Sequence, residues 1–234
     1  LNKTIHDLKR KEIEQTKCLN KFRELEFYAL EKLIIDNSDQ IEKNEFIYSK
    51  SNFNKILNIK DLHNFISLLE DVKIFAFKIE TSSDNPYESL IMGFSFFIDK
   101  NSGWYIPIQY LDKVGNNFGS NDLKVVLNIL KPIFENEKIL KISHNIKFSN
   151  LLLMIHSIKL KGLYFDTQLA AHLINPESKT YDIDHLSLEY MGKEVIRLED
   201  LTGKGRNKIN INSIHLDKIS YFYIQNIEAC YQLM

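Results

Sequence analysis

Two pairs of side chains have the spacing of a functional site. Lys78 and Glu80 lie two residues apart in the apolar stretch Phe75–Thr81, and alternate residues of a β-strand face the same side. Phe222 and Asn226 lie four residues apart in an apolar helical pattern, which places them on one face of a helix. A carboxylate such as Glu80 can hold a divalent metal ion, but a lysine beside it equally suits a plain solvated ion pair.

A second polar group follows another apolar strand. His144, Asn145, Lys147 and Ser149 come where this strand meets the next helix. Residues at such junctions often contact ligands, and they equally suit an ordinary polar loop at a strand end.

Three aspartates near helix starts have a simpler interpretation. Asp166 precedes a helical stretch and is predicted to cap it. Asp182 and Asp184 stand before His185 like a metal cluster, but nothing else supplies ligands at metal spacing. We therefore predict that Asp184 is an N-cap.

A mixed sheet is needed to position these groups. Lys73–Lys78, Leu90–Ile98 and Gly103–Ile108 are short apolar strands separated by turn residues, which predicts an antiparallel meander. Beyond them, strands alternate with amphipathic helices. The further strands are Lys138–Ser143 and Leu160–Phe165, and the helices are Asn121–Phe134, Ile146–His156 and Asp166–Asn175. The pattern predicts an α/β fold with a mixed five-stranded sheet and helices on both faces.

The N-terminal region has a different composition. Residues 4–35 are rich in Lys, Glu and Leu at near-helical spacing, and residues 36–45 are polar like a linker. We therefore predict a helical tail over residues 1–45 and one domain over residues 46–234. Within this domain, Asp61 is the predicted cap of a helix over Asp61–Asp71.

Composition narrows the functional classes. The 234 residues carry a formal net charge of -1, so a basic footprint for nucleic acid over the whole chain is absent. No apolar run approaches the roughly 20 residues of a membrane helix. The two cysteines lie near opposite ends and suggest neither a disulfide framework nor a zinc motif, so a reducing cytoplasm is expected.

Several segments together resemble a known family, the 3′–5′ exonuclease domain of bacterial family A DNA polymerases (DNA polymerase I). They are Phe75–Thr81, His144–Ser149, Lys161–His172, Leu198–Asn207 and the pair Phe222 and Asn226. The resemblance covers about residues 45–234 in order. Leu198–Asn207 is similar to the Glu-Glu-Ile-x-Gly-Lys-Gly stretch of that family, and Phe22–Phe27 resembles the tail that leaves its 5′-nuclease domain. The resemblance implies an RNase H-like exonuclease fold between a nuclease domain before it and a polymerase domain after it.

The resemblance also implies a catalytic site and its loss. In the family, acidic side chains hold two metal ions that hydrolyse a phosphodiester bond. Matched by position, the first Asp of the family is Lys78 here, its Glu is Glu80, its second Asp is Ser149, its Tyr is Phe222 and its last Asp is Asn226. One of four metal carboxylates remains, and Lys78 inverts a charge. The implied function is a degenerate domain that holds no metal, cannot hydrolyse DNA and serves as a scaffold in a replication and repair polymerase.

Partners follow from the same resemblance. His144, Asn145 and Lys147 match positions that in the family face the DNA end or support the site, so they are the predicted nucleic-acid contacts. DNA is expected as a partner through the parent polymerase, with weak or no binding by this chain alone. No cofactor is expected for the chain, Mg²⁺ is expected for the parent polymerase, and a monomer is expected.

Two other functions stay open. The first is an active metal-dependent 3′–5′ exonuclease with relocated ligands, drawn from Glu80, Asp84, Asp166 or Glu228. The second is a non-catalytic module that binds single-stranded DNA, against which the neutral net charge argues.

The implied loss of the metal ions leads to a structural prediction about Glu80. A buried unpaired carboxylate costs several kcal/mol, so Glu80 is expected to have acquired a partner. We predict the Lys78 ammonium within ~4 Å of the Glu80 carboxylate, with Ser149 or Asn226 hydrogen-bonded to the same group.

Overall fold

The computed structural model of the chain describes residues 18, 21, 22, 27, 52–98, 102–108, 122–203 and 209–234. The chain divides into two compact units, Leu1–Ser49 and Lys50–Met234. In the first unit, the Phe27 amide donates to the Phe22 carbonyl at 2.8 Å. The predicted helix over residues 4–35 lies largely outside the described residues, as does the predicted boundary after residue 45. Both stay predictions.

The second unit is built on a six-stranded sheet with the order β1-β4-β3-β2-β5-β6. Its strands are β1 Asn52–Lys55, β2 Ile74–Thr81, β3 Ile91–Phe97, β4 Ser102–Pro107, β5 Leu140–Ser143 and β6 Leu163–Asp166. The predicted meander is confirmed, because β3 pairs antiparallel with both β2 and β4. β5 and β6 then extend the sheet in parallel with β2. The mixed α/β fold is thus confirmed.

The predicted number of strands was wrong. β1 adds a sixth strand at the far edge, parallel to β4. Its sequence, Asn-Phe-Asn-Lys, is short and mostly polar, so it lacks the apolar alternation from which strands are predicted. It is held by backbone pairing with residues about fifty positions away, which local patterns do not report.

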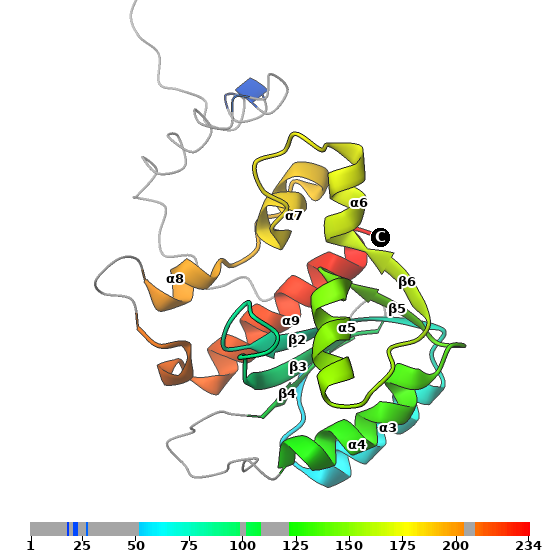
Figure 1. Cartoon of the computed structure of the whole chain (residues 1–234). Coiled ribbons are helices and arrows are strands. Elements are labelled where there is room, and N and C mark those ends of the chain that lie inside the picture. Colours follow the sequence, from blue (N-terminus) through cyan, green and yellow to red (C-terminus); the bar gives the residue numbers. More distant parts are fainter. Residues whose placement is uncertain are drawn as a thin grey trace, which may run out of the picture. The chain divides into compact units, whose positions relative to one another are not determined.

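Helices cover both faces of the sheet, as predicted (Figure 1). The helices are α3 Ile59–Glu70, α4 Asp122–Glu135, α5 Ile146–Ile155, α6 Thr167–Ile174, α7 Ile183–Met191, α8 Leu198–Thr202, the 3₁₀ turn η3 Ile211–Ser213 and α9 Leu216–Gln232. Phe75, Phe77 and Ile79 of β2 are buried in one core with α3 and α4. Ala76, between them in sequence, packs instead with Ile227 of α9. Strand alternation therefore turns Lys78 and Glu80 toward α9.

Two predicted helix caps were wrong. Asn58 caps α3 and accepts a hydrogen bond from the Asp61 amide at 2.9 Å. The helix begins earlier than predicted because Asn58 is as good a cap as Asp61. Asp182 occupies the N-cap position of α7, whereas Asp184 lies in its first turn and pairs with Arg197 at 2.9 Å.

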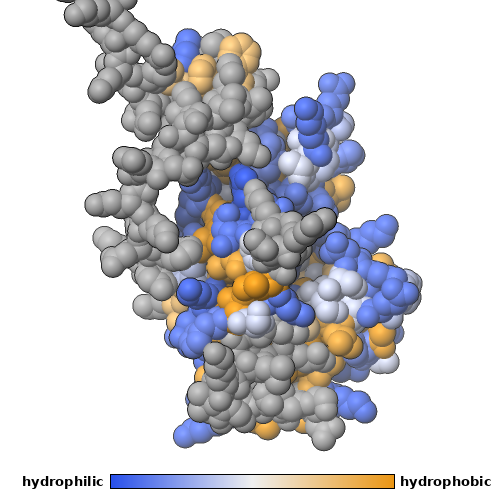
Figure 2. All heavy atoms as spheres, turned by 90° about the vertical axis from the view of Figure 1, so that its left-hand side faces the viewer, coloured by the Kyte–Doolittle hydropathy of each residue, from blue (hydrophilic) through white to orange (hydrophobic). Residues whose placement is uncertain are grey.

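The surface is mixed in polarity. Figure 2 shows one face of the molecule, seen at 90° to the view of Figure 1. The described residues on this face are largely hydrophilic, and apolar residues gather near its centre. No helix among the described residues is both long and apolar enough to cross a membrane.

Candidate functional site

The centre of the candidate site is a charged pair on β2. The Lys78 ammonium lies 3.5 Å from the Glu80 carboxylate, so the predicted ion pair is confirmed. Glu80 is buried, with 3% of its surface exposed, while the Lys78 side chain is 38% exposed. The carboxylate therefore lies inside the protein, and its counter-ion reaches it from the surface.

A hydroxyl completes the surroundings of Glu80. The Ser95 hydroxyl donates to Glu80 Oε1 at 2.9 Å. Burial raises the pKa of Glu80, and the Lys78 charge together with hydrogen bonds from Ser95 and Lys78 pulls it back down. Both neighbours thus favour the ionised form of a carboxylate that burial disfavours.

The predicted hydrogen-bond partners of this pair were wrong. Among the described residues, Glu80 takes its hydrogen bonds from Ser95 and Lys78. Asn226 instead donates its amide to the Phe222 carbonyl at 2.8 Å within α9. Ser149 is buried on α5. Ser95 lies opposite Lys78 in the β2–β3 register, and strand register could not be read from the sequence.

His144 lies at the end of β5, close to this pair. Its Nδ1 is 2.8 Å from the Thr167 hydroxyl. Burial lowers the pKa of His144 to about 4, with a further lowering by the Lys78 ammonium that three aspartates, Asp166 first among them, partly oppose. His144 is therefore neutral near pH 7, and its ring lies within the electrostatic reach of Lys78.

The other two predicted nucleic-acid contacts lie at the start of α5. Asn145 has a left-handed backbone, with φ of 61°, and its side-chain oxygen accepts from the Phe148 amide at 3.3 Å. Lys147 is exposed on the first turn. Asn145 thus has a helix-capping role, and Lys147 is open to solvent.

Asp166 fixes the two helix starts beside the site. Its carboxylate accepts the amides of Gln168 and Leu169 in α6, which confirms the predicted cap. It also accepts the amides of Asn145 and Ile146, at 3.2 and 2.7 Å. One carboxylate therefore holds the N-terminal ends of both α5 and α6, a double role that the sequence did not indicate.

The buried thiol of Cys230, on α9, lies at one side of the site. Cys230 Sγ lies 3.7 Å from the Thr167 hydroxyl, which also contacts His144. Burial raises the pKa of Cys230 to about 12, so the thiol is neutral and unreactive at physiological pH. Burial and, after it, the Glu80 charge raise the pKa of Tyr223 in α9. His144 and Cys230 beside the pair are thus neutral near pH 7, while the Asp166 carboxylate also acts on both of them.

Comparisons with known proteins show the family of this chain. The model of the 3′–5′ exonuclease family of DNA polymerase A proteins matches residues 53–217. The chain belongs to this family. DNA polymerase I of Pseudomonas aeruginosa is 26% identical over 221 residues, covering 91% of this chain and 24% of the relative. DNA polymerase I of Borreliella burgdorferi is 31% identical, covering 65% of this chain and 16% of the relative. The chain thus spans a quarter or less of these relatives.

Solved structures share the exonuclease fold. Pol1 of M. smegmatis, in a complex with DNA primer-template and dNTP, has a TM-score of 0.55 at 17% identity, covering 76% of this chain and 26% of that chain. NrnC of Brucella melitensis has a TM-score of 0.51 at 13% identity, covering 79% of this chain and 78% of that chain. The family match and these similarities confirm the predicted RNase H-like exonuclease fold.

The side chains present here do not fit the metal ions of the exonuclease family. Two divalent ions need several oxygen ligands and a net negative surrounding. Glu80 is the one carboxylate in the set of predicted site residues, and a lysine already neutralises it. The Asn226 amide nitrogen donates to the Phe222 carbonyl, and its neutral side-chain oxygen adds no negative charge to a metal site. Over the described ranges, no group of three or more His, Cys, Asp or Glu side chains could hold a metal ion.

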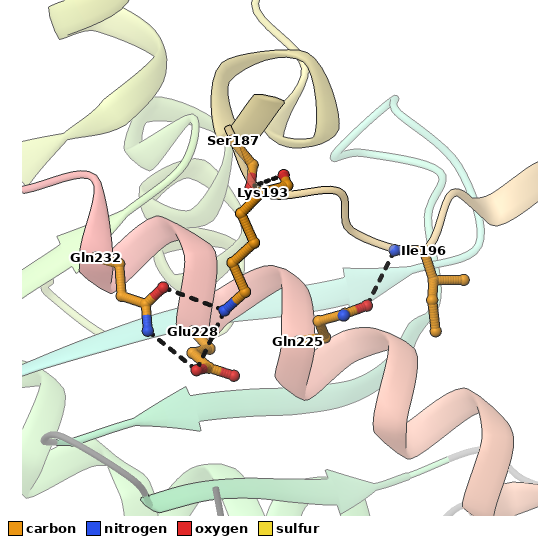
Figure 3. A network of polar contacts seen from close by, with 6 residues as sticks. All are labelled: Ser187, Lys193, Ile196, Gln225, Glu228 and Gln232. Carbon is orange, nitrogen blue, oxygen red and sulfur yellow. Dashed lines mark hydrogen bonds and ion pairs between the residues drawn. The ribbon is translucent and has the colours of Figure 1, made fainter. Parts of the chain in front are cut away.

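Two of the alternative ligands of a relocated exonuclease site, Asp166 and Glu228, are engaged in other contacts. Asp166 accepts backbone amides from two helices. Glu228 accepts hydrogen bonds from Lys193 at 3.4 Å and from Gln232 at 3.0 Å. Figure 3 shows this network, in which Glu228 faces the segment after α7. Two residues along a helix turn a side chain by about 200°, so Glu228 points away from the side of α9 that carries Asn226.

Proposed function

We propose that this chain is a degenerate 3′–5′ exonuclease domain that cannot hydrolyse DNA and serves as a scaffold in a DNA polymerase I. The observation that carries the proposal is the Lys78 ammonium, 3.5 Å from the Glu80 carboxylate. In an active member of the family, carboxylates at these two strand positions would face metal ions.

Electrostatics supports the loss of catalysis. Two unit charges 4 Å apart interact by about 4 kcal/mol at an effective dielectric constant of 20. An ammonium facing a divalent ion at that distance would therefore cost ~8 kcal/mol. Ser149 and Asn226 offer neutral groups that cannot offset such a cost. Phe222 also has no hydroxyl to position a water molecule.

The parent protein follows from the relatives. The two relatives compared by sequence are both DNA polymerase I proteins. We therefore assign the parent as a DNA-directed polymerase of replication and repair. DNA would then be its substrate and Mg²⁺ its metal, both held by parts outside this chain. A monomeric state and a cytoplasmic location belong to the same proposal.

A nuclease assay tests the proposed inactivity. The purified chain is incubated with 5′-labelled single-stranded DNA and Mg²⁺ or Mn²⁺, beside an exonuclease that has all four carboxylates. We expect no shortening of the DNA by this chain. Metal-stimulated trimming that is abolished in Glu80→Gln would overturn the proposal and revive the active exonuclease.

Binding of single-stranded DNA without catalysis is a separate candidate. It depends on His144, Asn145 and Lys147, of which the first two hold internal contacts. Fluorescence anisotropy with a labelled oligonucleotide tests it, with Lys147→Met as the variant. We expect weak binding or none, and binding that Lys147→Met weakens would support this alternative instead.

A further inference from the structure

The outer face of α6 is apolar and uncovered. Leu169, Leu173 and Ile174 are 56%, 73% and 70% exposed. Leu169 and Leu173 are four residues apart and share one face of the helix. The eight residues of α6 include no Asp, Glu, Lys or Arg, so no such charge interrupts this surface. We call these three side chains the α6 face.

The strand that leads into α6 adds to the exposed surface. β6 is an edge strand of the sheet, and it exposes half of Leu163 and 55% of Tyr164. Soluble monomers rarely expose large contiguous apolar patches, and larger ones mark interaction sites. Edge strands are usually protected by charge or by another segment.

The end of α9 lies next to the start of α6. Cys230 contacts Thr167, the first residue of α6, and Tyr231 packs in the same cluster as Phe165 of β6. The carboxyl end of the chain accordingly lies beside α6 (Figure 1). Any polypeptide that continues from Met234 would therefore start within reach of the α6 face.

The lengths of the relatives indicate how much of the parent protein could cover the α6 face. The matched region is 24% of the Pseudomonas aeruginosa polymerase and 16% of the Borreliella burgdorferi polymerase. Most of a parent of similar length would lie outside this chain.

We propose that the α6 face is the docking surface for the polymerase part that follows Met234 in the parent protein. This inference rests on the proposed function only in taking the chain as a piece of a DNA polymerase I. The partner surface is expected to be apolar, because the α6 face offers it no ion pair. The scaffold role would then be carried by α6 and α9, which would together hold the polymerase part in place.

Hydrogen–deuterium exchange tests the docking directly. Exchange is compared between the 234-residue chain and the parent protein extended beyond Met234. The amides of α6 are expected to exchange tenfold or more slowly in the extended protein, since covered helices open less often. The amides of α3, on the other side of the sheet, should not change.

A matched pair of variants separates docking from folding. Leu169→Glu with Leu173→Lys creates a favourable i,i+4 pair on α6, so the 234-residue chain should keep its melting temperature. In the extended protein, this variant should remove the added protection of α6. The control is Ile59→Glu with Leu68→Lys on α3, whose two residues are also exposed, and it should leave the protection of α6 intact.

Three outcomes would overturn the proposal. The first is unchanged α6 exchange in the extended protein. The second is a dimer of the 234-residue chain, measured by sedimentation, that the α6 variant dissociates. The third is α6 protection in the 234-residue chain that disappears when residues 1–49 are removed. None of these results depends on nuclease activity, so a failure here is distinguishable from a failure of the proposed inactivity.

Discussion

Removing the Lys78 ammonium should destabilise the fold by leaving Glu80 charged and unpaired. At 3.5 Å and an effective dielectric constant of 20, the pair interacts by about 5 kcal/mol. Lys78 is 38% exposed, so water screens much of this energy. We therefore expect Lys78→Met to lower the free energy of unfolding at pH 7 by about 2 kcal/mol.

The loss of unfolding free energy in Lys78→Met should grow as pH rises. Burial already raises the pKa of Glu80 above its ordinary value of 4.5, and Lys78→Met should raise it further. A carboxyl whose pKa is raised by folding stabilises the fold when protonated, and this contribution is lost as pH rises through the folded pKa. The gap between Lys78→Met and the native chain should thus be small near pH 4.5 and grow toward pH 7.

Urea unfolding over this pH range measures the effect. Lys147→Met, which removes an exposed lysine, is the matched control and should change stability by less than about 0.5 kcal/mol. Lys78→Met combined with Glu80→Gln should recover most of the loss, because the buried charge is gone. The account of the pair is refuted if Lys78→Met costs no more than Lys147→Met, or if the double variant recovers nothing.

Two further predictions concern the surroundings of the pair. His144 should titrate with a pKa of about 4 by NMR, and Lys78→Met should raise this pKa. Because folding lowers the pKa from 6.5, the free energy of unfolding should fall by ~3 kcal/mol as pH drops from 6.5 toward 4, and a His144→Phe variant should lack this dependence. Nuclease activity should appear, if at all, only when Lys78→Asp, Ser149→Asp and Asn226→Asp are combined. Full activity from Lys78→Asp alone would show that the other ligand positions were assigned wrongly.

The elements that could be predicted from the sequence are those with a local pattern. Alternation along β2 placed Lys78 and Glu80 on one face, and their separation of two residues made the ion pair predictable. The three strands of the meander were predicted because turn residues separate apolar runs. β1 was missed because four mostly polar residues carry no such pattern.

The rest of the site depends on contacts between distant segments. Ser95 reaches Glu80 through the register of two strands, and Thr167 reaches Cys230 across 63 positions. Neither contact has a local signal. Asp166 shows the intermediate case, since its cap of α6 follows from the sequence, while its hold on α5 requires β5 and β6 to be neighbours.

The central claim, that this site holds no catalytic metal, is tested most directly by a Mn²⁺ titration followed by electron paramagnetic resonance. The native chain should leave the free Mn²⁺ signal unchanged at millimolar metal, while the triple variant with three restored aspartates serves as the comparison. Stoichiometric Mn²⁺ binding by the native chain that is lost in Glu80→Gln would contradict the account.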